Sequence, residues 1–242
     1  MRDSDLNLTA RRWDDEYRQG RYDREPPLPF VDVITTSLKT HRAAGGGPGL
    51  YVGCGNGRNY LPLVDTGLDL YGLDVSAEAL RQLAARRPAQ ASRLICDDFR
   101  RFRWSERFHY VIAIQVFQHG TSADAAAYFG RVAALLKPGG FFFLRVNSAS
   151  TDVYYRHTVV ERSDGDGLTV QYLEGPKQGL AVHFYGGMEL QRLTQADFRA
   201  VAEPRENVTR RSAPKTGSWA QWEAIWERRT RGPAFVGQGA SP

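Results

Sequence analysis

Residues 50–57 read Leu-Tyr-Val-Gly-Cys-Gly-Asn-Gly, a short apolar run that leads into a glycine-rich turn. Glycine has no Cβ atom, so a turn of this kind brings the backbone close to a ligand. The next apolar run, residues 68–73, is followed by Asp74, 21 residues after Gly53. A carboxylate at that position can accept hydrogen bonds from ribose hydroxyl groups. Together the turn and the acid predict a binding site for an adenosine-containing cofactor.

The segment from residue 50 to residue 147 alternates short apolar runs with amphipathic stretches. A helix capped by Ser76 and a helix over residues 123–136 are expected within it, and residues 30–38 predict a helix ahead of it. Strands that alternate with helices favour an α/β fold, in which a mostly parallel sheet carries helices on both faces. The expected strands are residues 50–52, 68–73, 94–96, 110–115 and 141–146.

The chain beyond residue 147 follows a different pattern. The apolar runs 168–173 and 180–184 are joined through glycine and proline, which predicts a β-hairpin in an insertion over about residues 148–190. This insertion is expected to shape the substrate pocket. Three tryptophans further on are interpreted as one helical stripe that packs in the core or in a dimer contact: Trp219, Trp222 and Trp226.

Residues 1–28 are a polar N-terminal segment with several prolines at its end. Trp13 and Tyr17 lie four residues apart, so on a helix they share one face. We therefore expect a helical lead or lid over residues 1–28, followed by one domain over residues 29–242.

The spacing of the glycines separates two kinds of cofactor. A dinucleotide fingerprint needs a third small residue in G-x-G-x-x-G, and this chain has Arg58 at that place. Arg58 would crowd the helix against the strand, which disfavours a pyrophosphate-binding loop. S-adenosylmethionine has no pyrophosphate, and its sulfonium and amino acid part fit a tighter G-x-G-x-G turn.

At these motifs the chain resembles the class I S-adenosylmethionine-dependent methyltransferases, over residues 30–147 and more loosely to about residue 200. The run Leu-Lys-Pro-Gly-Gly at residues 136–140 matches a further motif of that family. The resemblance implies a Rossmann-like, seven-stranded, mostly parallel sheet and S-adenosyl-L-methionine as the cofactor. It places Gly53 and Gly55 at the methionine part of that cofactor.

The same resemblance assigns roles to residues at the ends of the later strands. Asp74 and Val75 fall at the ribose, and Asp98 falls at the adenine amino group, with Phe99 covering the ring. Gln115 falls under the transferable methyl group. N-terminal helices of the family often cover the cofactor, which would place Trp13 and Tyr17 over it. The chain departs from the family at Tyr51, where an acid often stands.

Methyl transfer is an in-line displacement, so the protein must mainly align the acceptor and exclude water. A base is needed only if the acceptor must lose a proton early, and the histidines are the candidates for it: His119, His157 and His183. No cluster of metal-ligating residues is evident in the sequence, so we expect no metal.

Composition narrows the class of protein further. The 242 residues are 42% hydrophobic and 24% charged, with two cysteines, which excludes a disulfide framework. No apolar run is long enough for a membrane span, and we expect a cytoplasmic protein. The formal net charge is +5, and only four of the 32 basic residues are lysines. Without a long basic run, this surplus is expected to face solvent.

The sequence thus predicts an enzyme, a methyltransferase acting on an O or N atom of a small molecule, with a homodimer as a possible assembly. Nucleic acid is disfavoured as a partner but not excluded. An RNA or protein methyltransferase that uses the arginine-rich surface is the first alternative. The second, of another class, is a non-catalytic adenosine-cofactor-binding or NAD-type protein.

Overall fold

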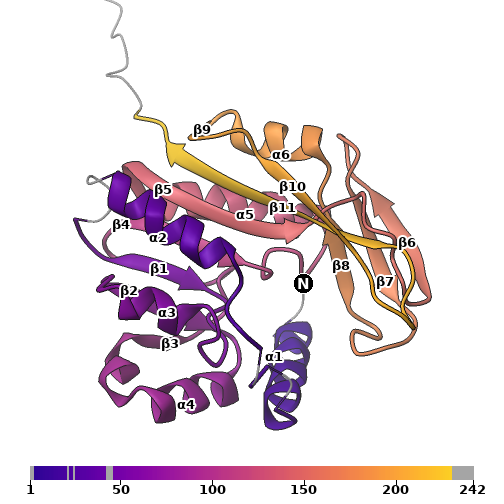
Figure 1. Ribbon diagram of the computed structural model, residues 1–242, viewed down its shortest axis with the longest axis horizontal. Coiled ribbons are helices and arrows are strands. Elements are labelled where there is room, and N and C mark those ends of the chain that lie inside the picture. The colour runs from indigo at the N-terminus through magenta and orange to yellow at the C-terminus, as the bar shows by residue number, and fades with distance from the viewer. Residues whose placement is uncertain (1–2, 21, 24, 42–45, 231–242) are drawn as a thin grey trace, which may run out of the picture.

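The computed structural model describes residues 3–20, 22–23, 25–41 and 46–230. A central sheet runs through it, with the strand order β10-β11-β5-β4-β1-β2-β3 and with β9 paired to β11 (Figure 1). Its first five strands are β1 (Gly49–Val52), β2 (Leu70–Asp74), β3 (Leu94–Cys96), β4 (Phe108–Ile114) and β5 (Leu136–Asn147). The later ones are β9 (Phe198–Ala200), β10 (Arg205–Arg210) and β11 (Ser218–Arg228).

The first five strands pair in parallel, and the later ones are antiparallel. β1 lies between β2 and β4, β3 pairs with β2, and β5 pairs with β4. β11 runs antiparallel to β5, β10 and β9. The predicted Rossmann-like, mostly parallel sheet is confirmed. The short β9, which the sequence did not predict, adds an eighth strand.

Helices cover both faces of this sheet, as predicted. One face packs on α2 (Phe30–Thr40), α3 (Tyr60–Asp65) and α4 (Ala77–Arg86), and the short 3₁₀ helix η1 (Pro88–Arg93) follows α4. The other face packs on α5 (Ser122–Leu135) and α6 (Gly187–Thr194). On β4, successive side chains point to opposite faces of the sheet and so contribute to both hydrophobic layers. Tyr110 and Ile112 point to the first face, and Val111 and Ala113 point to the second.

A smaller antiparallel sheet lies beside the carboxyl end of β5 and is formed by β6 (His157–Arg162), β7 (Leu168–Tyr172) and β8 (Ala181–Phe184) (Figure 1, right). The predicted hairpin corresponds to β7 and β8, and β6 is an additional strand. Backbone hydrogen bonds hold this accessory sheet to the loop after β4: Gly120 N donates to Ala181 O over 3.1 Å, and His183 N to Gln118 O over 2.8 Å. The accessory sheet therefore stands next to the edge at which parallel strands end.

The prediction of a helical stripe for the three tryptophans is wrong, because they lie on β11. Trp226 is 2% exposed and stacks on Phe142 of β5, whereas Trp219 is 39% exposed. Seven consecutive residue pairs join β11 to β5, from Gln221 opposite Asn147 to Glu227 opposite Phe141. This long-range pairing determines the structure of the segment and overrides its local spacing.

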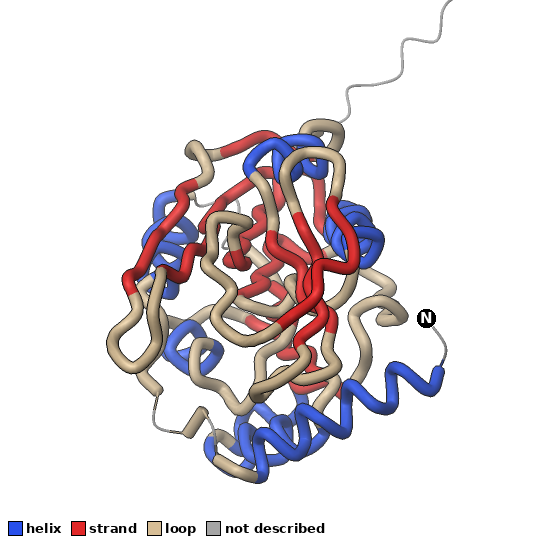
Figure 2. The backbone as a smooth tube through the Cα atoms, turned by 90° about the vertical axis from the view of Figure 1, so that its right-hand side faces the viewer, coloured by secondary structure: helices blue, strands red, loops and turns tan. Residues whose placement is uncertain are grey.

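α1 (Asp3–Arg18) lies outside these layers and packs on α4. In Figure 2 it is the helix that starts beside the N label and crosses the lower edge of the molecule. None of the helices in the described part of the chain has the length and apolar character that crossing a bilayer requires.

Candidate active site

The glycine turn after β1 is built for close backbone approach. Gly53 and Gly55 have φ angles of 71° and 54°, in the left-handed region that favours glycine. A Cβ atom on Gly53 would lie 2.7 Å from a methyl of Val116, and one on Gly55 would lie 2.3 Å from Tyr17 Oη. Neither position has room for a side chain, so the turn presents backbone to the space above it.

Asp74, the last residue of β2, is tied to this turn. Its Oδ2 accepts a hydrogen bond from Gly55 N over 2.8 Å, and its Oδ1 accepts one from Ser76 N over 2.9 Å. The residue is 8% exposed, and burial raises the pKa of its carboxyl although these backbone hydrogen bonds lower it. Each carboxylate oxygen keeps lone-pair capacity for one more donor, such as a ribose hydroxyl.

A cavity of about 480 Å³ opens above the turn, at the carboxyl ends of the parallel strands. We call it the cofactor cavity, after the residues predicted to bind the cofactor. Ligands of open α/β sheets bind at this edge. The structure brings all nine predicted cofactor residues to the cavity wall: Trp13, Tyr17, Gly53, Gly55, Asp74, Val75, Asp98, Phe99 and Gln115.

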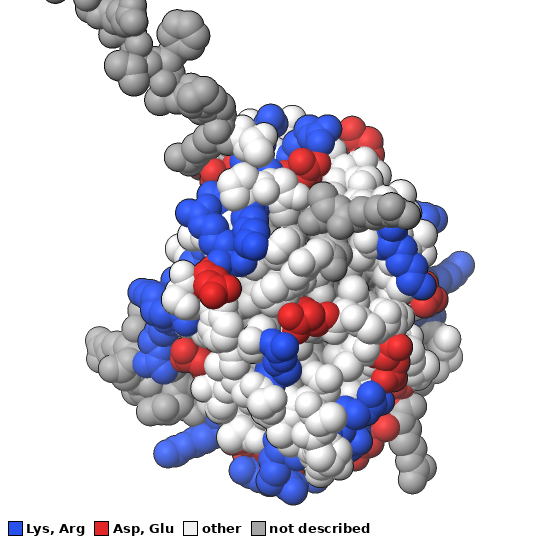
Figure 3. Space-filling model, turned by 90° about the vertical axis from the view of Figure 1, so that its left-hand side faces the viewer, with Lys and Arg blue, Asp and Glu red and all other residues white. Residues whose placement is uncertain are grey.

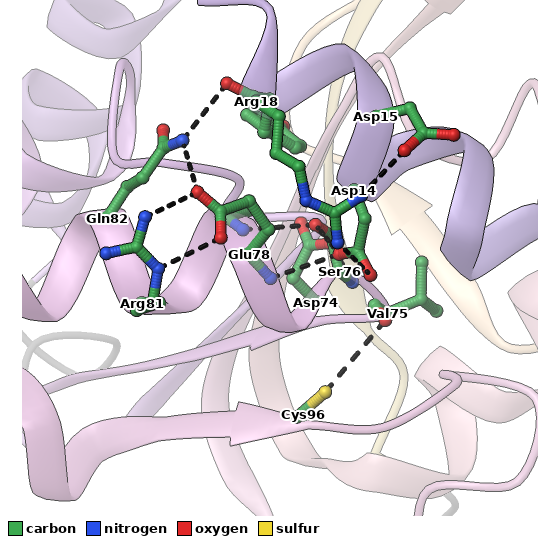
Figure 4. Close-up of polar contacts among 12 residues, drawn as sticks. Asp14, Asp15, Arg18, Asp74, Val75, Ser76, Glu78, Arg81, Gln82 and Cys96 are labelled. Carbon is green, nitrogen blue, oxygen red and sulfur yellow. Dashed lines mark hydrogen bonds and ion pairs between the residues drawn. The ribbon is translucent and has the colours of Figure 1, made fainter.

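Helix α1 closes one side of the cavity and is fixed by polar contacts to α4. Asp14 Oδ1 accepts hydrogen bonds from Ser76 Oγ over 2.6 Å and from Glu78 N over 3.0 Å (Figure 4). Gln82 Nε2 donates to Tyr17 O over 3.0 Å. Burial, with Asp74 nearby, raises the pKa of the Tyr17 hydroxyl well above its usual range. Tyr17 is therefore a neutral group against the glycine turn.

Asp98 is engaged by a residue that the sequence analysis did not single out. Arg100 donates to both carboxylate oxygens, with Nε 2.9 Å from Oδ1 and Nη2 2.6 Å from Oδ2. Burial raises the pKa of Asp98, but the hydrogen bonds from Arg100 outweigh it and the pKa lies below its usual value. Phe99 beside it stacks on Phe117 with 5.2 Å between ring centroids.

Gln115 closes β4 with a φ of 57°, which is uncommon for a residue with a side chain. Its N–H donates to Arg145 O over 2.7 Å, which ties the turn after β4 to β5. An unusual backbone conformation at the end of a strand is typical of a functional site.

The three predicted catalytic histidines lie in different places. His119 lines the cavity and makes an edge contact with Trp13, with 5.1 Å between centroids. Burial lowers its pKa to about 3, Lys177 lowers it further, and a hydrogen bond with the Gln115 backbone opposes both. The imidazole is therefore neutral at pH 7.

The structure does not bring His157 or His183 to the cavity wall. His183 is 1% exposed, and both ring nitrogens are engaged, with Thr169 Oγ1 at 2.8 Å and Glu189 Oε2 at 2.9 Å. His157 lies on β6, where its Nδ1 is 2.9 Å from Tyr155 O.

Two residues that depart from known sequence patterns also line the cavity: Tyr51 from the methyltransferase pattern and Arg58 from the dinucleotide fingerprint. Tyr51 is 1% exposed, and burial raises the pKa of its hydroxyl, opposed by a hydrogen bond with Asn59. Arg58 is paired with Glu25, and its Nε donates to Pro26 O over 2.7 Å. The absence of the usual acid at position 51 was the signal that this wall of the cavity is built differently.

Comparison with known proteins shows which proteins this chain is similar to. The family described as a methyltransferase domain matches residues 50–140. The ubiquinone biosynthesis O-methyltransferase of Bradyrhizobium sp. (strain ORS 278) is 37% identical over 93 residues, which cover 38% of this chain and 36% of that protein. The enzyme of the same name from Rhodopseudomonas palustris (strain HaA2) is 31% identical over 144 residues, or 55% of each chain. The chain thus spans between a third and about half of these relatives.

Solved structures share the fold over nearly the whole chain. An S-adenosylmethionine-dependent methyltransferase from Clostridium acetobutylicum ATCC 824 has a TM-score of 0.62 at 15% identity, covering 93% of this chain and 99% of that one. The 1,6-didemethyltoxoflavin-N1-methyltransferase of Burkholderia thailandensis has a TM-score of 0.61 at 19% identity, covering 95% and 92%. Residues 50–140 thus match a methyltransferase domain, and the fold of nearly the whole chain is that of these methyltransferases.

Proposed function

We propose that this protein transfers the methyl group of S-adenosyl-L-methionine to an O or N atom of a small molecule. The observation that carries the proposal is the cavity of about 480 Å³ that joins the glycine turn, Asp74 and His119 beneath α1. The relatives named as ubiquinone biosynthesis O-methyltransferases and the toxoflavin N1-methyltransferase act on small molecules, which supports the same class of acceptor here.

The residues of the cavity suit that cofactor. The backbone of Gly53 and Gly55 would meet its methionine part, and Asp74 would accept from its ribose hydroxyls. Asp98 and Phe99 would hold the adenine. The bound cofactor supplies an electrophilic methyl group, so the protein must orient the acceptor and exclude water rather than generate a strong nucleophile.

His119 is the residue that we assign to the acceptor. With a pKa of about 3, its imidazole accepts a hydrogen bond at pH 7 but holds a transferred proton poorly. It therefore orients an acceptor hydroxyl or amine, and bulk solvent takes the proton in the end. We propose α1, with Trp13 against His119, as the lid that excludes water.

The surface charge supports a small acceptor rather than a nucleic acid. On the face drawn in Figure 3, basic and acidic side chains are interspersed. Several exposed arginines are neutralised by carboxylates within 2.6 to 3.0 Å: Arg87 by Asp65, Arg93 by Asp69 and Arg199 by Glu227. Interspersed, paired charges give a weak field for steering a polyanion.

Calorimetry with S-adenosylmethionine, S-adenosylhomocysteine and NAD tests the proposal directly. We expect both sulfur compounds to bind and NAD not to bind. Release of labelled methyl groups onto a panel of small phenols and amines then identifies the acceptor class. Failure of both sulfur compounds to bind would refute the proposed function.

A further inference from the structure

A second cavity, of about 250 Å³, lies between the accessory sheet and the β10–β11 hairpin. We call it the tyrosine–lysine cavity. Its described wall holds five aromatic rings, those of Tyr154, Tyr155, Tyr172, Phe184 and Trp219. It also holds three basic side chains, those of Lys177, Arg211 and Lys215, and no acidic one among the described residues that line it.

One basic group of the cavity, the Lys215 ammonium, lies against its rings. The Lys215 ammonium lies 5.9 Å from the ring centroid of Tyr154 and 5.7 Å from that of Tyr155. Arg211 donates from Nη1 to Thr216 O over 3.0 Å, and its charge acts against the burial that raises the pKa of Tyr172. A cavity with aromatic walls and a positive rim matches a planar ring that carries an anionic group.

This cavity is close to the candidate active site. Lys177 lines it and also lines a groove of about 160 Å³ together with Trp13 and Leu180, which belong to the cofactor cavity. Burial lowers the pKa of His119, and the charge of Lys177 lowers it further, so the groove that Lys177 lines also connects to His119 electrostatically.

A second connection runs through the end of β5. Asn147 lines the tyrosine–lysine cavity, and its N–H donates to Gln118 Oε1 over 3.1 Å. Gln118 directly precedes His119 in the chain. The two cavities are thus joined by Lys177 on one side and by Gln118 with Asn147 on the other.

We propose that the tyrosine–lysine cavity binds the carboxylate-bearing aromatic end of the methyl acceptor. The proposal rests on the proposed function and adds the chemical class of the acceptor to it. The rings stack on the acceptor, and Arg211 and Lys215 pair with its carboxylate. Its nucleophilic atom then extends past Lys177 toward His119.

The test compares 6-hydroxy-2-naphthoate with its uncharged twin, 6-hydroxy-2-naphthamide, by calorimetry on the protein saturated with S-adenosylhomocysteine. The two probes have the same ring and hydroxyl and differ in charge, so we expect the carboxylate to bind at least about tenfold more tightly. Equal affinities would overturn the proposal.

Variants test whether the preference for the carboxylate probe arises in the tyrosine–lysine cavity. Arg211→Met combined with Lys215→Met should remove the preference for the carboxylate, and Arg199→Met, which loses one exposed arginine elsewhere, should keep it. A preference that survives in the double variant would place the site elsewhere and refute the inference. Unchanged binding of S-adenosylhomocysteine shows that each variant is folded.

Kinetics with an accepted aromatic acid separate anchoring from chemistry. The double variant should raise KM about tenfold with kcat nearly unchanged, because an anchor remote from the reacting atom binds ground state and transition state alike. A fall in kcat at constant KM would contradict the anchoring role. If S-adenosylhomocysteine does not bind at all, the proposed function fails, while the preference for the carboxylate can still be measured without it.

Discussion

The cofactor cavity and the tyrosine–lysine cavity are built from different parts of the chain in different ways. The first uses backbone: two glycines with positive φ, an N–H from Gly55 to Asp74, and a strained strand end at Gln115. The second uses side chains from an antiparallel sheet and a hairpin, such as Lys215 over Tyr154.

This difference separates what is fixed from what can vary. Backbone geometry at the end of a parallel strand tolerates few substitutions, because an added Cβ collides with its neighbours. Side chains on an accessory sheet can change without disturbing the main sheet. We therefore expect substitutions at the proposed acceptor side to alter specificity with less effect on the fold than substitutions at the glycine turn.

The largest expected effect is on the cofactor edge, at Asp74. Replacing Asp74 with Ala removes the acceptor for Gly55 N and for the ribose hydroxyls, and should weaken cofactor affinity by about 1 to 3 kcal/mol, or roughly 5- to 150-fold. Calorimetry with S-adenosylhomocysteine measures it. Asp65→Ala, which removes an exposed partner of Arg87, is the matched control. An unchanged affinity in Asp74→Ala would rule out its assigned role.

The next effect tests whether the close approach of Tyr17 to the backbone of the glycine turn matters for stability. Gly55→Ala places a Cβ 2.3 Å from Tyr17 Oη at a φ of 54°, and should lower the free energy of unfolding by about 1 to 2 kcal/mol. Adding Tyr17→Phe removes the colliding oxygen and should restore part of the loss, which a double-mutant cycle quantifies.

Gly67→Ala is the control for strain alone, since Gly67 has a φ of 89° and nothing within 4 Å of an added Cβ. Denaturant unfolding measures the wild type and all four variants. An equal loss in Gly67→Ala and Gly55→Ala, with no rescue by Tyr17→Phe, would mean that contact between α1 and the turn is unimportant.

A third effect, smaller at each pH step, concerns His119 in the wall of the cofactor cavity. Its pKa is about 3 in the folded protein and near 6.5 in the unfolded chain. The unfolded chain therefore binds a proton below about pH 6.5 that the folded protein does not bind. Stability should fall as the pH drops from 6.5 toward 3, by at most about 1 kcal/mol per pH unit once partial exposure is allowed for.

His119→Gln should remove this part of the acid sensitivity, and His157→Gln, at a histidine away from the cavity wall, should leave it in place. Denaturant unfolding at pH 7, 6, 5 and 4 measures how the free energy of unfolding changes with pH. An identical pH dependence in wild type and His119→Gln would contradict a depressed pKa.

The smallest effect sharpens the link between the cavities. Lys177→Met removes a positive charge near His119 and should raise the pKa of His119. That pKa should stay below its ordinary value, because burial is the larger cause. NMR titration of the imidazole signals, assigned with His119→Gln, follows the shift. A pKa that stays constant or falls would place Lys177 too far away to connect the cavities.

Local sequence was sufficient to place the glycine turn and Asp74 together at one edge of the sheet. The glycine turn and Asp74 could be located because their spacing is set by one strand, one turn and one helix, and Ser76 could be recognised as a cap from its position alone. Its Oγ indeed accepts from Ala79 N over 3.0 Å.

Long-range contacts explain what the sequence did not show. The spacing of Trp226 from the two tryptophans before it predicts a helix. In the structure, β5 pairs with that segment although it lies about 80 residues away in the sequence. His183 looked available for catalysis, yet Thr169 of β7 and Glu189 of α6 contact both of its ring nitrogens in the folded protein. Nothing local indicated that Lys177 would approach His119 from the turn between β7 and β8.

The hydrogen bonds that Asp14 accepts from Ser76 and Glu78 give the proposed lid a kinetic consequence. They join α1 to the helix that follows Asp74, and Gln82 holds the other end of the same contact at Tyr17. A spent cofactor that leaves past α1 must wait for these bonds to open together. We therefore expect α1 to set the residence time of the demethylated product, and with it the turnover rate.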